Sequence, residues 1–474
     1  MIFNSIEFAI FFPIIFLLYW LVFQRSLKGR NLFIIAASYF FYGVWDWRFL
    51  SLIFISSLVD FIIGNLIFKE EDSTKRKRYL ALSLISNLGI LIFFKYFNFF
   101  IDSFSEAFSL FGATMEVDRL NIILPVGISF YTFQTLSYTI DIYRKKLEPT
   151  KDPLSFFAFV SFFPQLVAGP IERAKDLLPQ FYSIKKANYQ DFKSGLIIVG
   201  TGLFQKIVIA DRLAIYVDGV FGNLDGAQGL PMVLGAVFFA FQLYLDFSAY
   251  SLIAIGLAKT LGFQLSTNFA RPYFAGTFSD FWNRWHISLS SWFRDYLYIP
   301  LGGSKNGSFN TKKNILIVFI LSGLWHGASW SFVIWGVLNG LFLICLDPLF
   351  TYLNLSKRIK PLLITCLWTF SLVFFRAPDF GSAFKAISQF GFGSADKLYD
   401  FGLNITEFKL VMLMLALFIV FEAFQEKGKL FWSFISRQHF FVRYSCYIGL
   451  ILTILFLGSY GVGVNDNNFI YFQF

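Results

Sequence analysis

Two histidines are the residues of this chain best suited to chemistry. The chain has three histidines in 474 residues, and His326 lies inside a strongly apolar run, residues 315 to 346. His286 lies 40 residues earlier, in a segment where aromatic and charged residues alternate. Imidazole changes its protonation state near neutral pH, so it can accept and return a proton during a reaction. At bilayer depth such a ring must be paired or functional, because water is absent there.

Polar residues close to His326 extend this pattern. Ser322, Ser329 and Asn339 interrupt the same apolar run, and each needs a partner inside a membrane. We interpret them with the two histidines as a polar pocket that enters the bilayer. The alternative is structural, since a membrane histidine often forms a hydrogen bond between helices.

The composition identifies an integral membrane protein. Hydrophobic residues make up 56% of the chain and charged residues only 15%, which is far less charge than soluble domains carry. Twelve apolar runs recur along the sequence, and at about 20 residues per pass they predict roughly ten to thirteen membrane passes. We therefore expect an all-α bundle forming a single membrane domain over residues 1 to 474, with interfacial and re-entrant helices. The runs cover residues 6 to 23, 32 to 45, 49 to 68, 79 to 99, 122 to 143, 154 to 169, 194 to 210, 231 to 258, 315 to 346, 362 to 375, 409 to 424 and 444 to 460.

Basic residues predict the orientation of the chain. The first 24 residues contain no Lys or Arg, and Arg25, Lys28 and Arg30 then follow together. Because basic loops stay in the cytoplasm, the N-terminus is predicted to be extracytoplasmic. The acidic segment 101 to 119 is predicted to be an external loop. The first run lacks a basic region before it, so we expect a retained span rather than a cleaved signal peptide.

Neither nucleic acid nor a metal is an expected ligand. The net charge of +10 comes from short basic loops between spans, which positive-inside topology explains. Cys345, Cys366 and Cys446 stand singly in apolar runs without metal-ligand spacing, so we expect small core residues. We expect no metal centre and no bound cofactor.

The segment around His286 differs from the spans. Residues 279 to 303 interleave aromatic side chains with Arg284, Arg294 and Asp295. This pattern predicts an amphipathic helix at the membrane interface or inserted into the bundle, with His286 on it. Such a helix would often serve only as a membrane anchor.

Several long motifs together resemble one family. The motifs that carry this resemblance are DFWNRWHISLSSWFRDYLYIPLGG, SGLWHGASWSFVIWGVLNG, the strings at 124 to 144, 162 to 174, 205 to 214 and 242 to 263, and the terminal FIYFQF. With them the chain resembles the membrane-bound O-acyltransferase (MBOAT) family. The resemblance is to its bacterial branch, which modifies alginate by O-acetylation and teichoic acid by D-alanylation. It covers most of residues 1 to 340, and the motif core is residues 122 to 346.

The resemblance implies a ring of helices around a central tunnel that joins the cytoplasm to the exterior. The family's catalytic histidine falls on His326, and its second polar position falls on His286. We expect His326 to act as general base, and His286 to act in catalysis or to position the donor or the first histidine. Trp325 would fix the rotamer of His326.

The remaining candidates are a set with weaker signals. Arg284 and Arg294 would bind coenzyme A phosphates, although anionic lipid headgroups suit them equally well. Asn283 is a candidate for substrate binding by proximity. Asp246, a carboxylate within an apolar run, would either form a buried pair or line the tunnel.

The expected activity is an O-acetyltransferase of the inner membrane. It would take an acetyl group from cytoplasmic acetyl-CoA and pass it to an extracytoplasmic polysaccharide, such as an alginate-like exopolysaccharide or peptidoglycan. No soluble domain follows the bundle, so the acceptor is expected to be either the polysaccharide itself or, as the resemblance implies, a periplasmic SGNH-type partner that completes the transfer. The partner is the favoured alternative. Two alternatives stay open, namely D-alanyl transfer from a carrier protein and a transporter or assembly scaffold without chemistry.

Overall fold

The computed structural model of the chain describes residues 1–110, 112, 119–391, 398–428, 431–460 and 469–470. The chain forms two compact units. Unit 1 comprises Met1–Gly195 and Leu257–Ser266, and unit 2 comprises Leu196–Gly256 and Thr267–Phe474. The regular secondary structure of the described residues is helical in both units, apart from an isolated β-bridge between Gly229 and Phe390. The all-α prediction is confirmed, whereas a single membrane domain over residues 1–474 stays a prediction.

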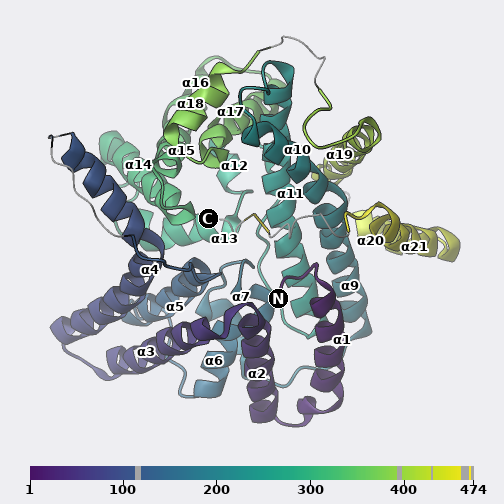
Figure 1. Cartoon of the computed structure of the whole chain (residues 1–474). Coiled ribbons are helices and arrows are strands. Elements are labelled where there is room, and N and C mark those ends of the chain that lie inside the picture. Colours follow the sequence, from purple (N-terminus) through teal and green to yellow (C-terminus); the bar gives the residue numbers. More distant parts are fainter. Residues whose placement is uncertain (111, 113–118, 392–397, 429–430, 461–468, 471–474) are drawn as a thin grey trace. The chain divides into compact units, whose positions relative to one another are not determined.

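Unit 1 contains the N-terminal helices (Figure 1). They are α1 (Ile6–Leu21), α2 (Leu27–Asp46), α3 (Leu50–Lys69), α4 (Ser73–Ser109), α5 (Ile128–Tyr143), α6 (Pro153–Ser161), α7 (Phe163–Leu166) and α8 (Ala174–Leu177). Helices α9 (Tyr189–Leu203) and α11 (Leu230–Thr260) have residues in both units.

Unit 2 contains the remaining helices and the segment around both candidate histidines. Its helices are α10 (Asp211–Gly222), α12 (Phe278–Trp282), α13 (Ile287–Phe293), α14 (Gly307–His326), α15 (Trp330–Leu341), α16 (Asp347–Tyr352), α17 (Ile359–Arg376), α18 (Phe380–Ser388), α19 (Ile405–Glu426), α20 (Phe431–Ser436) and α21 (Phe440–Leu457). Among the described residues of this unit, three π-helical segments accompany them, namely Phe204–Ala210, Arg294–Tyr298 and Phe342–Leu346.

Eight helical stretches of the described chain are long and apolar enough to cross a membrane, and they make this a multi-pass membrane protein. One of them, Leu27–Lys69, holds both α2 and α3. The others are Ile6–Arg25, Ser73–Ser109, Tyr189–Gly222, Leu230–Thr260, Trp330–Tyr352, Ile359–Arg376 and Phe440–Leu457. The predicted span 231 to 258 corresponds closely to α11. The long run 315 to 346 contains the second half of α14 and, after a break at 327 to 329, the first part of the candidate span Trp330–Tyr352.

Some sequence-based expectations about individual segments were wrong. The runs 122 to 143 and 154 to 169 form the shorter helices α5, α6 and α7, whose residues are mostly buried inside unit 1. Residues 101 to 109, expected in an external loop, form the last turns of α4, where Asp102 pairs with Arg119 at 2.8 Å. Glu116 and Asp118 of that loop, and residues 471–474 of the terminal FIYFQF motif, lie outside the described residues.

The cysteine expectation was also wrong. Cys345 and Cys366 are exposed and Cys446 is half-buried, so they are not core residues. All three lie on helices or π-helical segments with apolar outward faces, where a thiol tolerates contact with lipid as well as contact with protein.

Local sequence explains where several helices begin. Ser5 accepts a hydrogen bond from the backbone N–H of Phe8 and starts α1. Asp72 accepts one from Thr74 and starts α4. Asn404 and Glu407 form a capping box at the start of α19. Each cap satisfies donors that the first helical turn leaves without partners.

Two glycines allow α14 and α15 to pack closely in unit 2 (Figure 1). A Cβ atom on Gly323 would overlap the carbonyl oxygen of Phe332, and one on Gly336 would overlap that of Phe319. Small residues that let two backbones approach are typical of helix pairs in membranes. The contact matters for function because His326 is the last residue of α14.

Candidate active site

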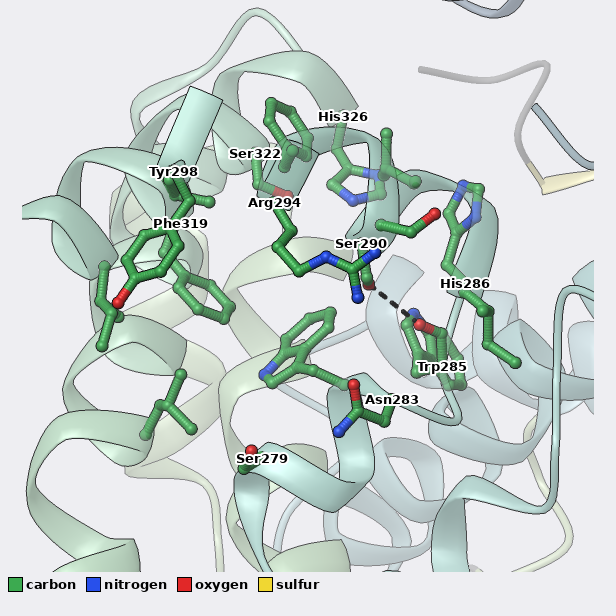
Figure 2. Close-up of a pocket in the computed structure, with 18 residues that line it drawn as sticks. Ser279, Asn283, Trp285, His286, Ser290, Arg294, Tyr298, Phe319, Ser322 and His326 are labelled. Carbon is green, nitrogen blue, oxygen red and sulfur yellow. Dashed lines mark hydrogen bonds between the residues drawn. The ribbon is translucent and has the colours of Figure 1, made fainter. Parts of the chain in front are cut away.

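A cavity of about 470 Å³ in unit 2 is lined by both His286 and His326 (Figure 2). Its wall comes from α12, α13, the π-helical segment after α13, and α14. Polar residues form much of the remaining lining, namely Ser279, Asn283, Ser290, Ser291, Arg294, Tyr298 and Ser322. Two histidines that are 40 residues apart in the sequence therefore line one cavity together with Ser322. Ser329 and Asn339, which were expected in the same polar pocket, are not among its lining residues.

His286 lies at a break between two short helices. Its backbone is left-handed (φ 42°, ψ 54°), a conformation that is uncommon for residues with side chains. Helix α12 ends at Trp282 and α13 begins at Ile287, so the single amphipathic helix expected over residues 279 to 303 was wrong. The break turns the chain so that the imidazole is part of the cavity wall.

The neighbouring segment 268–270 holds this break in place. The backbone N–H of Ala270 donates to the carbonyl of Arg284 at 2.9 Å, and that of Ile287 donates to the carbonyl of Asn268 at 2.9 Å. The side-chain oxygen of Asn268 also lies 3.1 Å from Nδ1 of His286. A strained residue persists only where its surroundings determine it, and these contacts do so here.

The His286 ring is enclosed by aromatic side chains. Phe247 contacts it edge-on with ring centroids 4.6 Å apart, and Phe269 lies 6.3 Å away. The side chain is only 1% exposed. Burial lowers the pKa of His286 to about 3, so the ring is neutral at neutral pH.

His326 is placed by three aromatic rings at the C-terminal end of α14. Trp325, Trp335 and Phe375 surround it, with centroid distances of 5.0, 5.1 and 5.3 Å. The next residue is Gly327, where a Cβ atom would overlap the ring of Phe332. The WHG sequence therefore has a steric explanation, because no larger residue fits after His326.

Trp325 contacts both histidines. Its ring centroid lies 5.9 Å from that of His286 and 5.0 Å from that of His326. Edge-to-face contacts of this kind are favourable and directional. The predicted role of Trp325 as a support for His326 is compatible with this position.

The sequence of this chain matches a known protein family. The sequence pattern of the "MBOAT, membrane-bound O-acyltransferase family" matches residues 40–375. This chain belongs to the MBOAT family. As a member, it is an O-acyltransferase.

Named relatives of this MBOAT protein include enzymes of polysaccharide modification. It is 38% identical over 431 residues to "Probable alginate O-acetylase AlgI" of Pseudomonas putida, covering 88% of this chain and 87% of the relative. It is 34% identical to "Peptidoglycan O-acetyltransferase" of Helicobacter pylori, covering 82% and 79%. The similarity to "Teichoic acid D-alanyltransferase" of Streptococcus thermophilus is weaker, at 28% over 47% of this chain and 56% of the relative.

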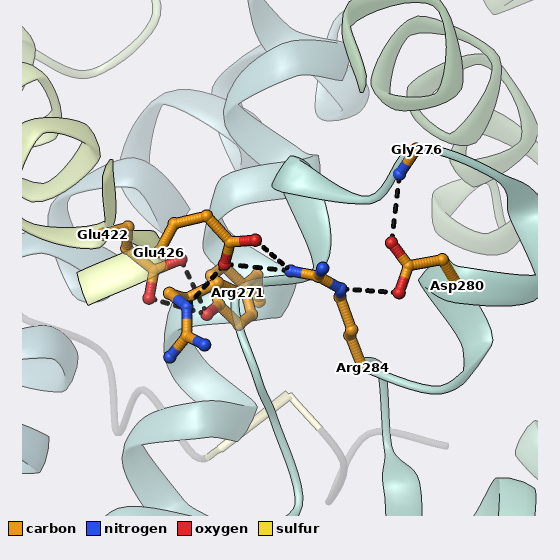
Figure 3. A network of polar contacts seen from close by, with 7 residues as sticks. Arg271, Gly276, Asp280, Arg284, Glu422 and Glu426 are labelled. Atoms are coloured by element: carbon orange, nitrogen blue, oxygen red, sulfur yellow. Dashed lines mark hydrogen bonds and ion pairs between the residues drawn. The ribbon is translucent and has the colours of Figure 1, made fainter. Parts of the chain in front are cut away.

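The two candidate arginines of this MBOAT protein have different surroundings. Arg294 lines the cavity, is 59% exposed and pairs with Asp295 at 2.8 Å. Arg284 belongs to an ion-pair network with Asp280 and Glu426, at 2.8 and 2.9 Å (Figure 3). Arg271 joins the same network through Glu426 at 2.8 Å. The described lining of the cavity includes Arg294 and Asn283 but not Arg284, Asp246 or Trp325.

Asp246 forms a buried pair, which is the first of the two alternatives predicted for it. Lys206 lies 2.6 Å from one of its oxygens and also 2.9 Å from Asp211. The backbone N–H of Ile470 donates to the other oxygen at 2.6 Å. The ring of Phe469 lies 4.4 Å from the Lys206 ammonium. These contacts attach the C-terminal residues 469–470 to the core of unit 2.

Sequence reasoning missed the partners of these residues. Asn268, which contacts His286, lies in an unremarkable loop sequence after α11, and Lys206 lies in an apolar run. Glu426 likewise shows no local motif. A polar residue inside or beside an apolar run was the available signal, but the identity of its partner depends on tertiary contacts.

Proposed function

We propose that this MBOAT protein transfers an acetyl group from cytoplasmic acetyl-CoA across the membrane to an extracytoplasmic polysaccharide. The observation that supports this best is the shared cavity of His286 and His326 in an O-acyltransferase whose named relatives O-acetylate alginate or peptidoglycan. The greater similarity to O-acetylating relatives favours acetyl transfer over D-alanyl transfer.

In the proposed step, His326 is the general base. It accepts the proton of the attacking hydroxyl while that oxygen forms a bond to the thioester carbonyl carbon. The carbon–sulfur bond then breaks, and the coenzyme A thiolate leaves and takes up the proton. The products are the acetyl ester and free coenzyme A thiol, and the imidazole returns to its neutral form.

The cavity suits this reaction in size and character. A volume of about 470 Å³ accommodates an acetyl thioester with part of its pantetheine arm, and pockets of this size are typical of small-molecule sites. Arg294 is the cation at the lining that we propose for contact with the donor phosphates. Asn283 supplies an amide that donates and accepts hydrogen bonds.

The acceptor side is proposed to involve a second protein. A periplasmic SGNH-type partner would receive the acetyl group and pass it to the glycan. We further propose that the protein resides in the inner membrane with its N-terminus outside, as the early basic residues indicate.

Substitution of single histidines tests the proposal. His326→Ala is expected to leave insertion and abundance unchanged and to abolish O-acetylation of the surface glycan. His439→Ala is the matched control, because His439 is exposed at the start of α21 and is outside the cavity lining. Wild-type acetyl ester content in a normally expressed His326→Ala strain would contradict the assignment.

Two further measurements address the alternatives. Loading of purified protein with acyl groups from a carrier-protein thioester, but not from acetyl-CoA, would indicate D-alanyl transfer. Retained acetylation in a double variant, His286→Ala with His326→Ala, would indicate a transporter or scaffold without chemistry of its own.

A further inference from the structure

Asn268 is at the centre of a buried hydrogen-bond network that ends at His286. Its side-chain oxygen lies 3.1 Å from Nδ1 of His286 and accepts from the backbone N–H and the hydroxyl of Ser288, at 3.2 and 2.9 Å. Its side-chain nitrogen donates to the hydroxyl of Ser251 on α11 at 3.0 Å. All four residues are at most 5% exposed.

This pattern of donors determines the orientation of the Asn268 amide. The backbone N–H of Ser288 can only donate, so the atom facing it must be the oxygen. The hydroxyl of Ser251 can accept, and it therefore matches the amide nitrogen on the other side. Flipping the amide would place its N–H₂ group against the N–H of Ser288, which is unfavourable in a buried site.

The amide orientation in turn determines the tautomer of His286. An amide oxygen only accepts hydrogen bonds, so Nδ1 of His286 must carry the proton that it donates. In a neutral imidazole, Nε2 then carries the lone pair. The neutral state follows from burial, which lowers the pKa of His286 to about 3.

We propose that Asn268 is a positioning residue for acyl transfer, which holds His286 in its Nδ1–H tautomer so that Nε2 is the basic atom at the cavity. This inference rests on the proposed function, because it assumes that His286 acts in acetyl transfer. Partners of this type that orient a functional histidine fix both its tautomer and its ring orientation.

The charged surroundings are compatible with a neutral His286. Around the cavity the other titratable or charged residues are Arg294, Tyr298 and His326, and Arg294 is already paired with Asp295. Asn268 and Ser251 also line a second cavity of about 230 Å³, where the charged residues are Arg271 and Glu422. On α11, Asp246 is paired with Lys206.

Asn268→Asp provides the sharpest test. A carboxylate keeps an acceptor for Nδ1–H but adds negative charge beside the ring, so the pKa of His286 must rise. The assay uses membranes supplied with radiolabelled acetyl-CoA. In the wild type, His286 stays neutral between pH 5.5 and 8, so its protonation should not reduce glycan acetylation in this range. The Asn268→Asp variant should lose activity at least tenfold on the acidic side of this range and recover toward pH 8.

Two more variants separate positioning from folding. Asn268→Leu removes the acceptor and should lower kcat by about 10- to 100-fold, the range known for hydrogen-bond partners of metal-ligating histidines, while KM for acetyl-CoA changes less than twofold. Ser251→Ala removes only the acceptor that holds the amide nitrogen and should lower kcat by a smaller factor. The matched control is Asn87→Leu, which removes a buried amide of unit 1 that is bonded to Ser56 and Asp60 and is outside the cavity lining. It should lower abundance without changing kcat per folded molecule.

The possible outcomes lead to different conclusions. A wild-type pH profile for Asn268→Asp, or an unchanged kcat for folded Asn268→Leu, would overturn the inference when His286→Ala is inactive. If His286→Ala and His326→Ala both keep wild-type activity, the proposed function itself fails. Folding of each variant is measured by thermal unfolding in detergent. If the Asn268 variants do not fold, the Ser251→Ala result decides, and an unchanged kcat there contradicts the inference.

Discussion

Gly323 on α14 and Gly336 on α15 face each other directly, and a Cβ atom on either would lie 3.4 Å from the Cα atom of the other. The same Cβ atoms would overlap backbone carbonyl oxygens of the facing helix. Backbone cannot rotate away as a side chain can, so substitution must separate the two helices. Because His326 ends α14, a change in this helix pair reaches the cavity.

Gly323→Ala is therefore expected to destabilise the protein by about 1–3 kcal/mol, as overpacking of a tight contact does, and to lower acetyl transfer. Thermal unfolding and glycan acetylation measure the two effects. Gly89→Ala on α4 is the control, since an added Cβ there meets no atom within 4 Å. In a helix this substitution is neutral or stabilising by up to about 1 kcal/mol. If Gly323→Ala and Gly89→Ala have the same thermal stability and the same glycan acetylation, the close contact at Gly323 does not matter for either property.

The cluster of Lys206, Asp211 and Asp246 gives a second prediction. Lys206 is shared by the two carboxylates, and all three side chains are at most 4% exposed. Lys206→Met would leave two buried carboxylates close together without their shared cation. Removing one partner of a buried ion pair costs about 3–5 kcal/mol, so we expect a large drop in thermal stability.

Compensating substitutions supply the control for this cluster. A triple variant, Lys206→Met with Asp211→Asn and Asp246→Asn, removes all three charges and should recover part of the lost stability. Lys305→Met changes an exposed lysine and should have little effect. A Lys206→Met protein as stable as the wild type would show that the ion pairs contribute nothing.

Prediction from the sequence succeeded where the signal was local. The apolar run 231 to 258 is long and uninterrupted, and α11 corresponds to it within a few residues. The WHG segment and its apolar context singled out His326, which lines the cavity, whereas its role as general base stays a prediction. Membrane helices satisfy their own backbone hydrogen bonds, so their existence depends mainly on composition.

Prediction failed where the structure depends on partners distant in sequence. Residues 279 to 303 have a helical pattern, but the segment breaks at His286 because segment 268–270 bonds to the backbone on both sides of it. Arg284 has the charge expected of a phosphate ligand, yet its partner Glu426 lies 142 residues later. The same holds for Asn268, whose role depends on contacts with α11 and α13.

The low pKa of His286 predicts the pH dependence of stability. In the unfolded chain, histidine binds a proton below about pH 6.5, whereas burial lowers the pKa in the folded protein to about 3. Between these values the unfolded state binds more protons, so the stability falls as the pH decreases, by up to about 1.4 kcal/mol per pH unit. Above pH 6.5 this contribution to stability is complete and constant.

His286→Asn tests this dependence, because asparagine tolerates the left-handed backbone at this position. Thermal unfolding of both proteins should be compared at pH 4.5 and pH 7.5. The variant should lose less stability than the wild type on acidification. An equal loss in both proteins would mean that other groups cause the pH dependence.

The two candidate arginines should give separable effects. Arg294 lines the cavity and is more than half exposed, so its guanidinium is accessible to a phosphate of the donor. Arg294→Gln is expected to raise KM for acetyl-CoA about tenfold, the equivalent of losing one charge-assisted hydrogen bond, with kcat nearly unchanged. Arg284 bonds to Asp280 and Glu426, so Arg284→Gln should lower thermal stability by about 1 kcal/mol and leave KM unchanged.

Kinetics at two salt concentrations add a further check, since added salt weakens an exposed ion pair with the donor. The wild-type KM should rise with salt, and the KM of the Arg294→Gln variant should change little. A larger effect on KM from Arg284→Gln than from Arg294→Gln would assign donor binding to the network of Figure 3 instead of the cavity.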